Sequence, residues 1–538
     1  MLIHISGRPS RDFIFVLTPM NLKEKAGQQL MIGISGTTID PETERQLQEI
    51  QPGFIILFAR NISSAGQVKE LIAGLKQTVS PPPLIAIDQE GGRVIRFVGE
   101  ITVFPGNMAL GAAASIDLAF KQGFASALQL KSLGIDINLA PVVDVLTEHY
   151  NPGITIRSFG DNPEQVTELA VAFARGTRMA GIAAVAKHFP GMGAARVDAH
   201  FDLPAVTLSE QEFEAVHRLP FRKVMENGIS GIMSSHLNCP ALDGNGNLPA
   251  TFSAAIVADY IRRRCGYDGL IFSDDLEMGA IAKHFSIGES CLRAMRAGHD
   301  VLLICKDYGR QKAGLYALLD GYTRSDPAQE GLDESVGRIS ALRDFCSAPI
   351  SAHEHFQDAV PEELAQAIAR QAVTVIAAGT GPLPIDSAAT DEIQLIIPDL
   401  SSTPVIEDGY EPSEHHPVIR ACRECFPGSC SFHFFPLNPR PDDVERIAAA
   451  ADRQSPCIVF LSDALGNRGQ QNLIVKIRER CRQPIFVLLD NPFDYTLIAP
   501  GETCLTAYGM RKAQLLALVE VICGKAPAPG KLPFRIQP

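Results

Sequence analysis

An aspartate and a histidine stand two residues apart in Asp198-Ala199-His200, at the end of a glycine-rich loop. The loop begins after an apolar run with the sequence KHFPGMG, residues 187–193, and its glycines and proline give it a defined shape. A carboxylate beside an imidazole fixes the tautomer of the ring and stabilises its protonated form, which suits acid/base catalysis. An unrelated surface pair would have the same spacing, so the pattern alone leaves both interpretations open.

A second candidate group is a carboxylate in the stretch FSDDLEM, residues 272–278. Asp274 lies at the predicted end of an apolar strand, where a carboxylate can act as a nucleophile. The alternative is a helix N-cap, because Ser or Asp before a helix accepts hydrogen bonds from free backbone N–H groups. Since three adjacent residues cannot all be caps, we assign capping to Asp275 and chemistry to Asp274.

The third candidate stretch is IDQEGGRVIR, residues 87–96. Asp88 ends a predicted strand, and the two glycines that follow allow a tight turn. Asp88 and Arg96 near one site can hold the polar groups of a ligand by charge-assisted hydrogen bonds. A purely structural ion pair explains the same residues equally well.

Eight short apolar runs, separated by helix-sized stretches, are available to position these groups. They are Leu30–Ile34, Phe54–Phe58, Leu84–Ile87, Ile135–Leu139, Ile182–Ala186, Gly231–Met233, Leu270–Phe272 and Val301–Ile304. Short strands that are apolar on both faces and alternate with helices indicate buried parallel strands. The fold class predicted is α/β, with a (β/α)8 TIM-like barrel whose active site lies at the C-terminal ends of the strands.

Polar residues follow most of these runs, as that fold requires. They are Arg60, Asp88, Asp144, Lys187, His188, His236 and Asp274. Strand ends are also simply where polar residues occur, so each position taken alone has a structural explanation. For His236 we prefer that structural explanation to a role in the site.

The 538 residues are too many for one ordinary core, so a second domain is expected. We expect a leader at 1–19, a catalytic barrel at 20–345, a linker at 346–360 and a smaller α/β sandwich at 361–538. The runs Val373–Ala377, Ile393–Ile397, Cys457–Leu461 and Ile485–Leu489 predict its buried strands, and Pro361 opens a helix. Met20 is an alternative start of translation.

The formal charge of −13 argues against nucleic acid as a partner, because phosphate binding needs a basic field. No apolar run approaches the ~18 residues needed to cross a bilayer. The 12 cysteines are mostly scattered, which indicates a reducing, cytoplasmic location. We expect no cofactor and no metal, because the glycines at 379–381 lack a dinucleotide motif and the cysteines at 422–430 lack standard zinc spacing.

Together these segments resemble a known family. IDQEGGRVIRF, IRSFGDNP, KHFPGMG with its later DAH, and IFSDDLEM are similar to the signature segments of glycoside hydrolase family 3, in its order, across roughly residues 22–345. The loop that ends in D-x-H is similar to that of the β-N-acetylglucosaminidase branch. The second domain, with its tail GKAPAPGKLPF, resembles the family's α/β sandwich more loosely.

The resemblance implies a role for each matching residue. Asp274 would be the nucleophile, His200 the acid/base and Asp198 its partner. The terminal sugar would be held by Asp88, Arg96, Arg157, Lys187 and His188. The implied activity is that of a retaining exo-β-N-acetylhexosaminidase that releases terminal N-acetylglucosamine (GlcNAc) from small saccharides such as peptidoglycan fragments.

Other functions stay open at this stage. They are a phosphorylase, since a histidine acid/base does not repel phosphate, a broad β-glucosidase, and a non-catalytic saccharide-binding protein. Met192 stands where many relatives have His, and we expect little effect. Without any Trp, stacking must use Phe, Tyr or His, which favours a pocket for one sugar over a long groove. The second domain could provide stability, a homodimer interface or contacts to the aglycone.

Overall fold

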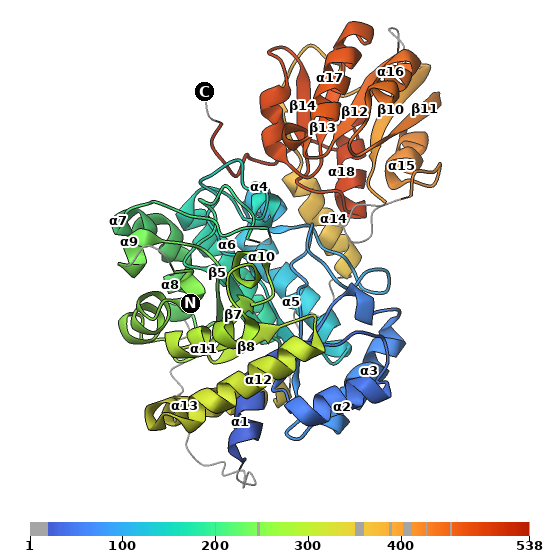
Figure 1. Ribbon diagram of the computed structural model, residues 1–538. Helices are drawn as coiled ribbons and strands as arrows, with labels where there is room; N and C mark the ends of the chain where they lie inside the picture. Colours follow the sequence, from blue (N-terminus) through green and yellow to red (C-terminus); the bar gives the residue numbers. More distant parts are fainter. Residues whose placement is uncertain are drawn as a thin grey trace, which may run out of the picture.

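A computed structural model describes residues 20–199, 201–244, 248–349, 360–386, 390–401, 411–426, 428–451 and 455–536. His200, the expected leader at 1–19 and most of the expected linker lie outside the described residues. The chain forms two layered bodies, one coloured blue to yellow and the other orange to red (Figure 1).

The first body is a closed barrel of eight parallel strands, as the sequence predicts. The strands are β1 (Leu30–Gly33), β2 (Phe54–Leu57), β3 (Leu84–Ile87), β4 (Ile137–Asn138), β5 (Ala183–Phe189), β6 (Gly231–Ser234), β7 (Leu270–Asp275) and β8 (Val301–Ile304). The barrel closes where Met31 of β1 pairs with Leu303 of β8. β5 and β7 extend past the predicted apolar runs into the polar residues, so the chemistry-bearing side chains are carried by regular strand ends.

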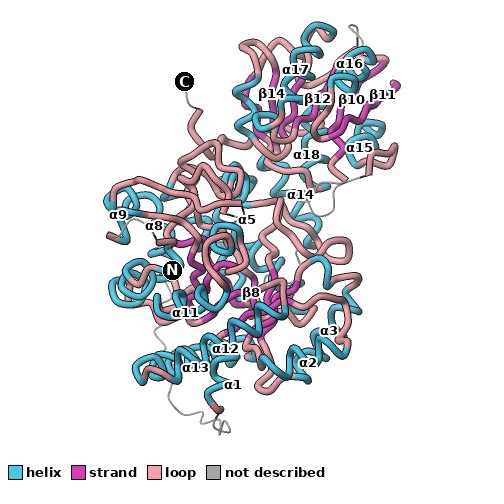
Figure 2. Tube along the Cα trace, in the orientation of Figure 1, coloured by secondary structure: helices cyan, strands magenta, loops and turns pink. Residues whose placement is uncertain are grey.

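Helices surround the barrel (Figure 2). They are α1 (Leu22–Gln28), α2 (Pro41–Ile50), α3 (Ala65–Thr78), α4 (Asn107–Ala113), α5 (Ile116–Ser132), α6 (Pro163–Met179), α7 (Glu210–Glu212), α8 (Arg218–Glu226), α9 (Pro240–Asp243), α10 (Gly279–Ala282), α11 (Ile287–Ala297), α12 (Tyr308–Thr323) and α13 (Asp326–Ser347). Several begin at a side-chain cap: Asp40 accepts from Thr43 N at 2.7 Å, for example. Among these described helices, none is long and apolar enough to cross a membrane.

The interior of the barrel is packed with side chains. They include Phe54 and Phe272 of the strands, whose rings meet edge to face at 5.9 Å. Ile339, Leu342 and Cys346 of α13 belong to the same buried cluster and pack against the N-terminal ends of the strands. In barrels of this kind ligands bind at the C-terminal mouth, where the strands end in polar residues.

The second body is built on a six-stranded sheet in the order β11-β10-β12-β13-β14-β9. Its strands are β9 (Thr374–Ala377), β10 (Glu392–Asp399), β11 (Ser429–Pro436), β12 (Cys457–Leu461), β13 (Ile485–Leu488) and β14 (Thr503–Thr506). Its helices are α14 (Pro361–Ala372), α15 (Pro417–Cys425), α16 (Pro441–Ala450), α17 (Arg468–Arg480) and α18 (Lys512–Ile522). Only β9 runs antiparallel, so the other five strands form a doubly wound parallel layer.

The four predicted strands of this domain are confirmed, while β11 and β14 were missed. β11 is a half-buried edge strand that mixes polar and aromatic residues, and β14 spans four residues with a threonine at each end. Neither has the fully apolar run on which the prediction relied. The boundaries predicted for the domains stay a prediction, although α13 ends at Ser347 and α14 begins at Pro361.

The two bodies are packed together through α14 and the loops above it. Leu364 and Ile368 of α14 belong to the buried cluster of the barrel flank, whereas Ala369 and Val373 belong to the core of the second domain. In the loop after β4, the ring of His149 stacks on Phe493 of the second domain, with ring centres 4.2 Å apart. The two domains therefore share buried apolar surface.

Candidate active site

Four charged side chains meet at the barrel mouth: Asp88 and Glu90 after β3, Arg157 in the loop after β4, and Lys187 at the end of β5. Lys187 Nζ lies 2.7 Å from Asp88 Oδ1 and 2.8 Å from Glu90 Oε1. Arg157 donates to both oxygens of Glu90, at 2.8 and 2.9 Å. Arg96 is more distant, with Nη2 3.6 Å from Asp88 Oδ2. The structure thus brings together four of the sequence-predicted sugar-binding residues, Asp88, Arg96, Arg157 and Lys187.

Glu90 is the centre of this cluster and was missed by the sequence analysis, although it lies inside a stretch that was singled out. Burial on its own would raise the pKa of Glu90, but Arg157 and Lys187 outweigh it and hold that pKa well below its usual value. Burial would likewise lower the pKa of Lys187, but Asp88 and Glu90 raise it overall. These groups therefore stay ionised across the physiological pH range.

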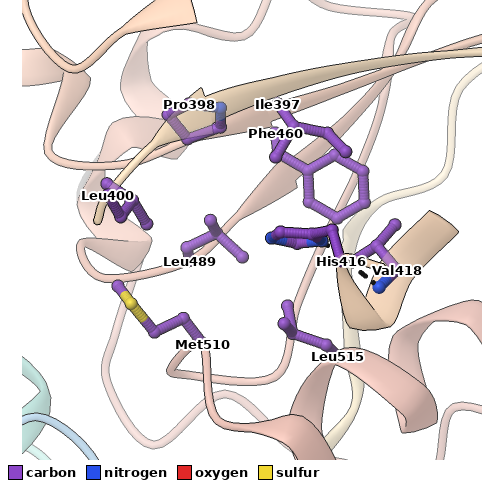
Figure 3. Close-up of a pocket in the computed structure, with 9 residues that line it drawn as sticks. All are labelled: Ile397, Pro398, Leu400, His416, Val418, Phe460, Leu489, Met510 and Leu515. Atoms are coloured by element: carbon purple, nitrogen blue, oxygen red, sulfur yellow. Dashed lines mark hydrogen bonds between the residues drawn. The ribbon is translucent and has the colours of Figure 1, made fainter. Parts of the chain in front are cut away.

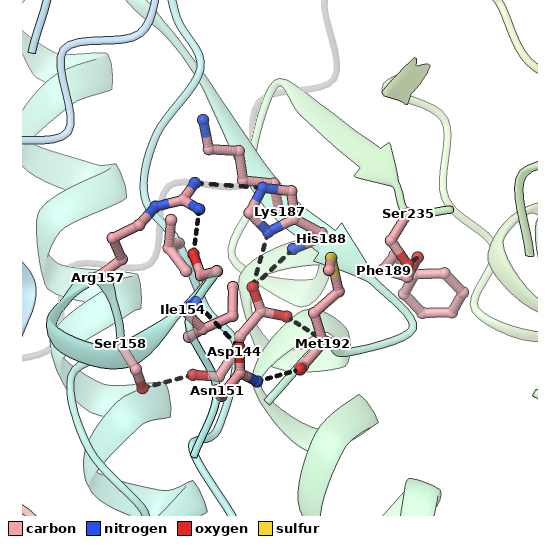
Figure 4. A network of polar contacts seen from close by, with 12 residues as sticks. Asp144, Asn151, Ile154, Arg157, Ser158, Lys187, His188, Phe189, Met192 and Ser235 are labelled. Carbon is pink, nitrogen blue, oxygen red and sulfur yellow. Dashed lines mark hydrogen bonds and ion pairs between the residues drawn. The ribbon is translucent and has the colours of Figure 1, made fainter. Parts of the chain in front are cut away.

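His188 is oriented by a second residue to which the sequence assigned no role, Asp144. Its Nδ1–H donates to Asp144 Oδ2 at 2.8 Å, and the His188 backbone N–H donates to the same oxygen at 3.2 Å (Figure 4). The other oxygen accepts from Met192 N at 2.6 Å. Nε2 of His188 is left pointing at Arg157, whose Nη2 lies 3.4 Å away. Asp144 therefore fixes the tautomer of His188 and the start of the loop.

Asp274 lies near the end of β7 and is partly exposed, with Oδ1 accepting from Asp275 N at 2.8 Å. Burial raises the pKa of the Cys305 thiol at the end of β8, and the carboxylates of Asp275, Asp88 and Asp274 raise it further. Asp88 follows β3 and Asp274 lies near the end of β7, so both carboxylates come from C-terminal strand ends of the barrel.

The helix-capping role predicted for Asp275 is wrong. α10 begins after Met278 without a side-chain cap. Asp275 Oδ1 instead accepts from Glu277 N at 3.1 Å, which closes the turn after β7. Burial raises the pKa of Asp275 to about 7. His236 is fully buried and its Nε2 donates to the Asp275 carbonyl at 2.9 Å, which is the structural role that the sequence favoured.

The loop that ends at Asp198 returns to the segment that carries Arg157. A Cβ placed on Gly153 would lie 3.5 Å from Cγ of Asp198, while the Gly153 carbonyl accepts from Arg157 Nη1 at 2.6 Å. Ala199 is buried, and its carbonyl accepts from Ala280 N at 3.1 Å. Asp198 therefore lies near the segment that carries Arg157 of the charged cluster, whereas its predicted partner His200 lies outside the described residues.

A second pocket, in the C-terminal domain, does not have the chemistry of this site. Its walls are almost entirely hydrocarbon, with His416 the exception (Figure 3). Burial lowers the pKa of His416 to about 4, so its ring is neutral at physiological pH. Among the described residues, no group of three His, Cys, Asp or Glu side chains could hold a metal ion.

A closed parallel barrel with buried carboxylates and cations at its C-terminal mouth defines the class of barrel enzymes that bind polar ligands there. Residues 21–342 match the family model described as the glycosyl hydrolase family 3 N terminal domain. The chain therefore belongs to glycoside hydrolase family 3, which confirms the resemblance seen in its motifs, and it is a glycoside hydrolase.

Similar proteins differ in how much of the chain they match. A beta-hexosaminidase of Nitrosomonas eutropha is 40% identical over 284 residues, which are 52% of this chain and 80% of that protein. A beta-hexosaminidase A of Pseudoalteromonas piscicida is 31% identical over 449 residues, 75% of each. The structure of a family 3 beta-N-acetylglucosaminidase from Paenibacillus sp. str. FPU-7 covers 96% of this chain and 99% of its own, with 31% identity and a TM-score of 0.89. The two-domain architecture is shared with that enzyme.

Proposed function

We propose that this protein is a retaining exo-β-N-acetylglucosaminidase that releases a terminal GlcNAc from β-linked saccharides. The observation that carries the proposal is the buried cluster of Asp88, Glu90, Arg157 and Lys187 at the barrel mouth, the end of the barrel at which β7 also presents Asp274. Ionised carboxylates and fixed cations can grip the hydroxyl groups of one sugar by charge-assisted hydrogen bonds. The names of similar proteins, a beta-hexosaminidase and a beta-N-acetylglucosaminidase, support GlcNAc as that sugar.

In the proposed mechanism, Asp274 attacks the anomeric carbon and forms a glycosyl ester while the glycosidic C–O bond breaks. His200, oriented by Asp198, gives its proton to the leaving oxygen. Water then attacks the same carbon, His200 takes its proton, and the carboxylate of Asp274 is released. Asp88, Arg96, Arg157, Lys187 and His188 hold the sugar throughout, and the product keeps the β configuration.

We further propose that the natural substrates are peptidoglycan fragments in the cytoplasm. The proposal rests on the similarity of the KHFPGMG loop and its D-x-H ending to the acetylglucosaminidase branch. It requires neither a cofactor nor a metal, because a carboxylate and a histidine carry all proton and bond transfers. A homodimer is compatible with this function but is not needed for it.

The test compares p-nitrophenyl β-GlcNAc with the corresponding glucoside, with and without inorganic phosphate. The proposal predicts a strong preference for GlcNAc, release of the free sugar in both buffers, and a β product that NMR detects before mutarotation. Asp274→Asn should abolish turnover while the purified protein keeps its affinity for GlcNAc. Formation of sugar 1-phosphate, a preference for the glucoside, or a wild type no more active than Asp274→Asn would contradict it.

A further inference from the structure

A large cavity lies at the end of the barrel opposite the mouth. Its volume is about 460 Å³, within the range of roughly 300–1,000 Å³ that small-molecule sites occupy. Two lining residues fix its place, since Gln29 directly precedes β1 and His299 lies two residues before β8. Its other walls come from α11, α12 and α13, which lie together in Figure 1, and from the helical segment Ala255–Arg264. The mechanism above uses none of these residues.

Small residues leave room for a ligand in this cavity. Ala258, Ala328 and Gly331 form part of its wall. A Cβ placed on Gly331 would meet no atom within 4 Å outside the neighbouring backbone of α13. A glycine inside a helix costs about 1 kcal/mol relative to alanine, and here no side chain packs into the space that it leaves. Met295 and Leu332 add apolar surface to the same wall.

Three arginines from different elements line the cavity: Arg262, Arg296 of α11 and Arg338 of α13. Arg338 Nε donates to Asp300 Oδ1 at 2.9 Å, and Arg262 pairs with the other oxygen of that carboxylate. Arg338 Nη1 also lies 3.6 Å from Glu334 Oε2, but Glu334 is 71% exposed and water weakens the pair. Arg296 forms no ion pair within the part of the chain that the structure describes.

The charges around the cavity are therefore not balanced. Three guanidinium groups share one fully buried carboxylate, Asp300, and one exposed carboxylate, Glu334. Burial lowers the pKa of Arg262, and the attraction of Asp300 does not offset this effect because Arg338 also lowers that pKa. Burial lowers the pKa of His299 to about 4, so this ring adds no charge near neutral pH. An anion inside the cavity would be attracted.

We propose that this cavity binds a small organic anion with a carboxylate or phosphate head and a compact apolar body. Arg296 and Arg338 take the head group, because guanidinium groups match the geometry of both anions. Met295 and Leu332 contact the apolar body. Since only the folded barrel holds the anion, its binding raises the free energy of unfolding. The inference goes beyond the proposed function and does not depend on it.

The experiment is isothermal titration calorimetry on the full chain with four probes. Benzoate and phenyl phosphate share an apolar ring and differ in the head group, so their relative affinity identifies the preferred anion. Benzamide is the neutral counterpart of benzoate, and inorganic phosphate is a head group without a body. We expect one site whose Kd for the better organic anion is at least ~10-fold lower than for benzamide and for inorganic phosphate. Saturating GlcNAc should leave this Kd unchanged, because the sugar binds at the other end of the barrel.

A charge variant tests the head group. Arg296→Gln should raise the Kd of the better organic anion ~10-fold, the effect of losing one charge-assisted hydrogen bond. Arg293→Gln is the matched control, because Arg293 lies on the same helix, pairs with Glu289 at 2.7 Å and is not part of the cavity wall. The Kd of this control should equal that of the wild type.

A filling variant tests the cavity itself. Gly331→Leu should abolish binding while circular dichroism shows an intact fold, because leucine is a better helix former than glycine. Gly337→Leu is its control, since Gly337 is an exposed glycine of α13 with equal free space and lies outside the cavity wall. Absence of binding by both organic anions, equal affinity for benzoate, phenyl phosphate and benzamide, displacement by GlcNAc, or an unchanged Kd in both Arg296→Gln and Gly331→Leu would each refute the site.

Discussion

Replacing Glu90 by glutamine removes the negative charge that lies between Lys187 and Arg157 and keeps the volume of the side chain. Glu90 has a side chain 2% exposed, and its partners are 4% and 13% exposed, so water cannot replace the lost charge. Breaking one partner of a buried ion pair costs about 3 kcal/mol at the lower end. We therefore expect Glu90→Gln to lower the free energy of unfolding of the barrel by about that amount.

The same change should weaken catalysis, because Lys187 and Arg157 lose the group that fixes their positions. If about 2.7 kcal/mol of that cost is expressed in binding the transition state, kcat/KM on the aryl glycoside falls ~100-fold. The assays are urea unfolding at pH 5 and pH 8 and steady-state kinetics at pH 7. The pKa of Glu90 is held below its usual value, so its contribution is lost only in strong acid. The difference from wild type should therefore be equal at both pH values.

Glu226→Gln provides a matched control. Glu226 is 50% exposed and pairs with Lys223 at 2.7 Å, an interaction worth less than about 1 kcal/mol at the surface. If Glu90→Gln destabilised the protein no more than Glu226→Gln, the argument that the buried cluster positions Lys187 and Arg157 would be refuted.

Three further predictions concern other residues. Asp144 accepts hydrogen bonds from His188 Nδ1 and from the Met192 N–H, and Asp144→Asn removes one of these two acceptor oxygens. We expect kcat/KM to fall by at least ~10-fold while circular dichroism shows an intact fold. Unchanged kinetics would contradict this prediction. Burial raises the pKa of Asp494 to about 7. The contribution of Asp494 to the free energy of unfolding is therefore fully present below pH ~4 and is lost as the pH rises through 7. In urea titrations, the free energy of unfolding of Asp494→Asn should therefore fall less than that of the wild type between pH 4 and pH 8. An equal fall in both proteins would show that the titration of Asp494 does not cause this pH dependence. Met192→His introduces an imidazole into an apolar cluster that includes Phe493 and Phe534, so the free energy of unfolding should fall by ~1–3 kcal/mol, with a lower melting temperature. Met295→His, at a partly buried site away from the mouth, is the comparison.

The barrel could be predicted from the sequence because its strands are buried on both faces and therefore carry uninterrupted apolar runs. The bounds of β3 (Leu84–Ile87) and β8 (Val301–Ile304) are the same as those of the predicted apolar runs. β5 and β7 could not be bounded in this way, because their last residues are polar and serve the mouth. Strand ends that carry chemistry break the pattern by which strands are recognised.

The site could be predicted only in part, for a related reason. Asp88 and Lys187 were placed correctly at the mouth, since a polar residue after an apolar run is visible in the sequence. The contacts of Glu90 and Asp144 depend on residues 67 and 44 positions away in the chain, Arg157 and His188. No local pattern contains such a partner. For Asp275, the assignment as a cap failed because the strand continued where a helix start was expected.

The apolar cluster shared by the two domains has a consequence for how this protein folds. Met108 and Ile156 of the barrel lie in it with Phe493 and Phe534 of the second domain, and α14 contributes to the cores on both sides. A fragment ending at residue 345 would expose that surface to water, at a cost that grows with the apolar area uncovered. The two domains should consequently unfold in one cooperative transition, and a barrel produced alone should aggregate. We therefore expect the barrel and the second domain, which are separate bodies in the ribbon (Figure 1), to behave as one unit in the folding thermodynamics of this chain.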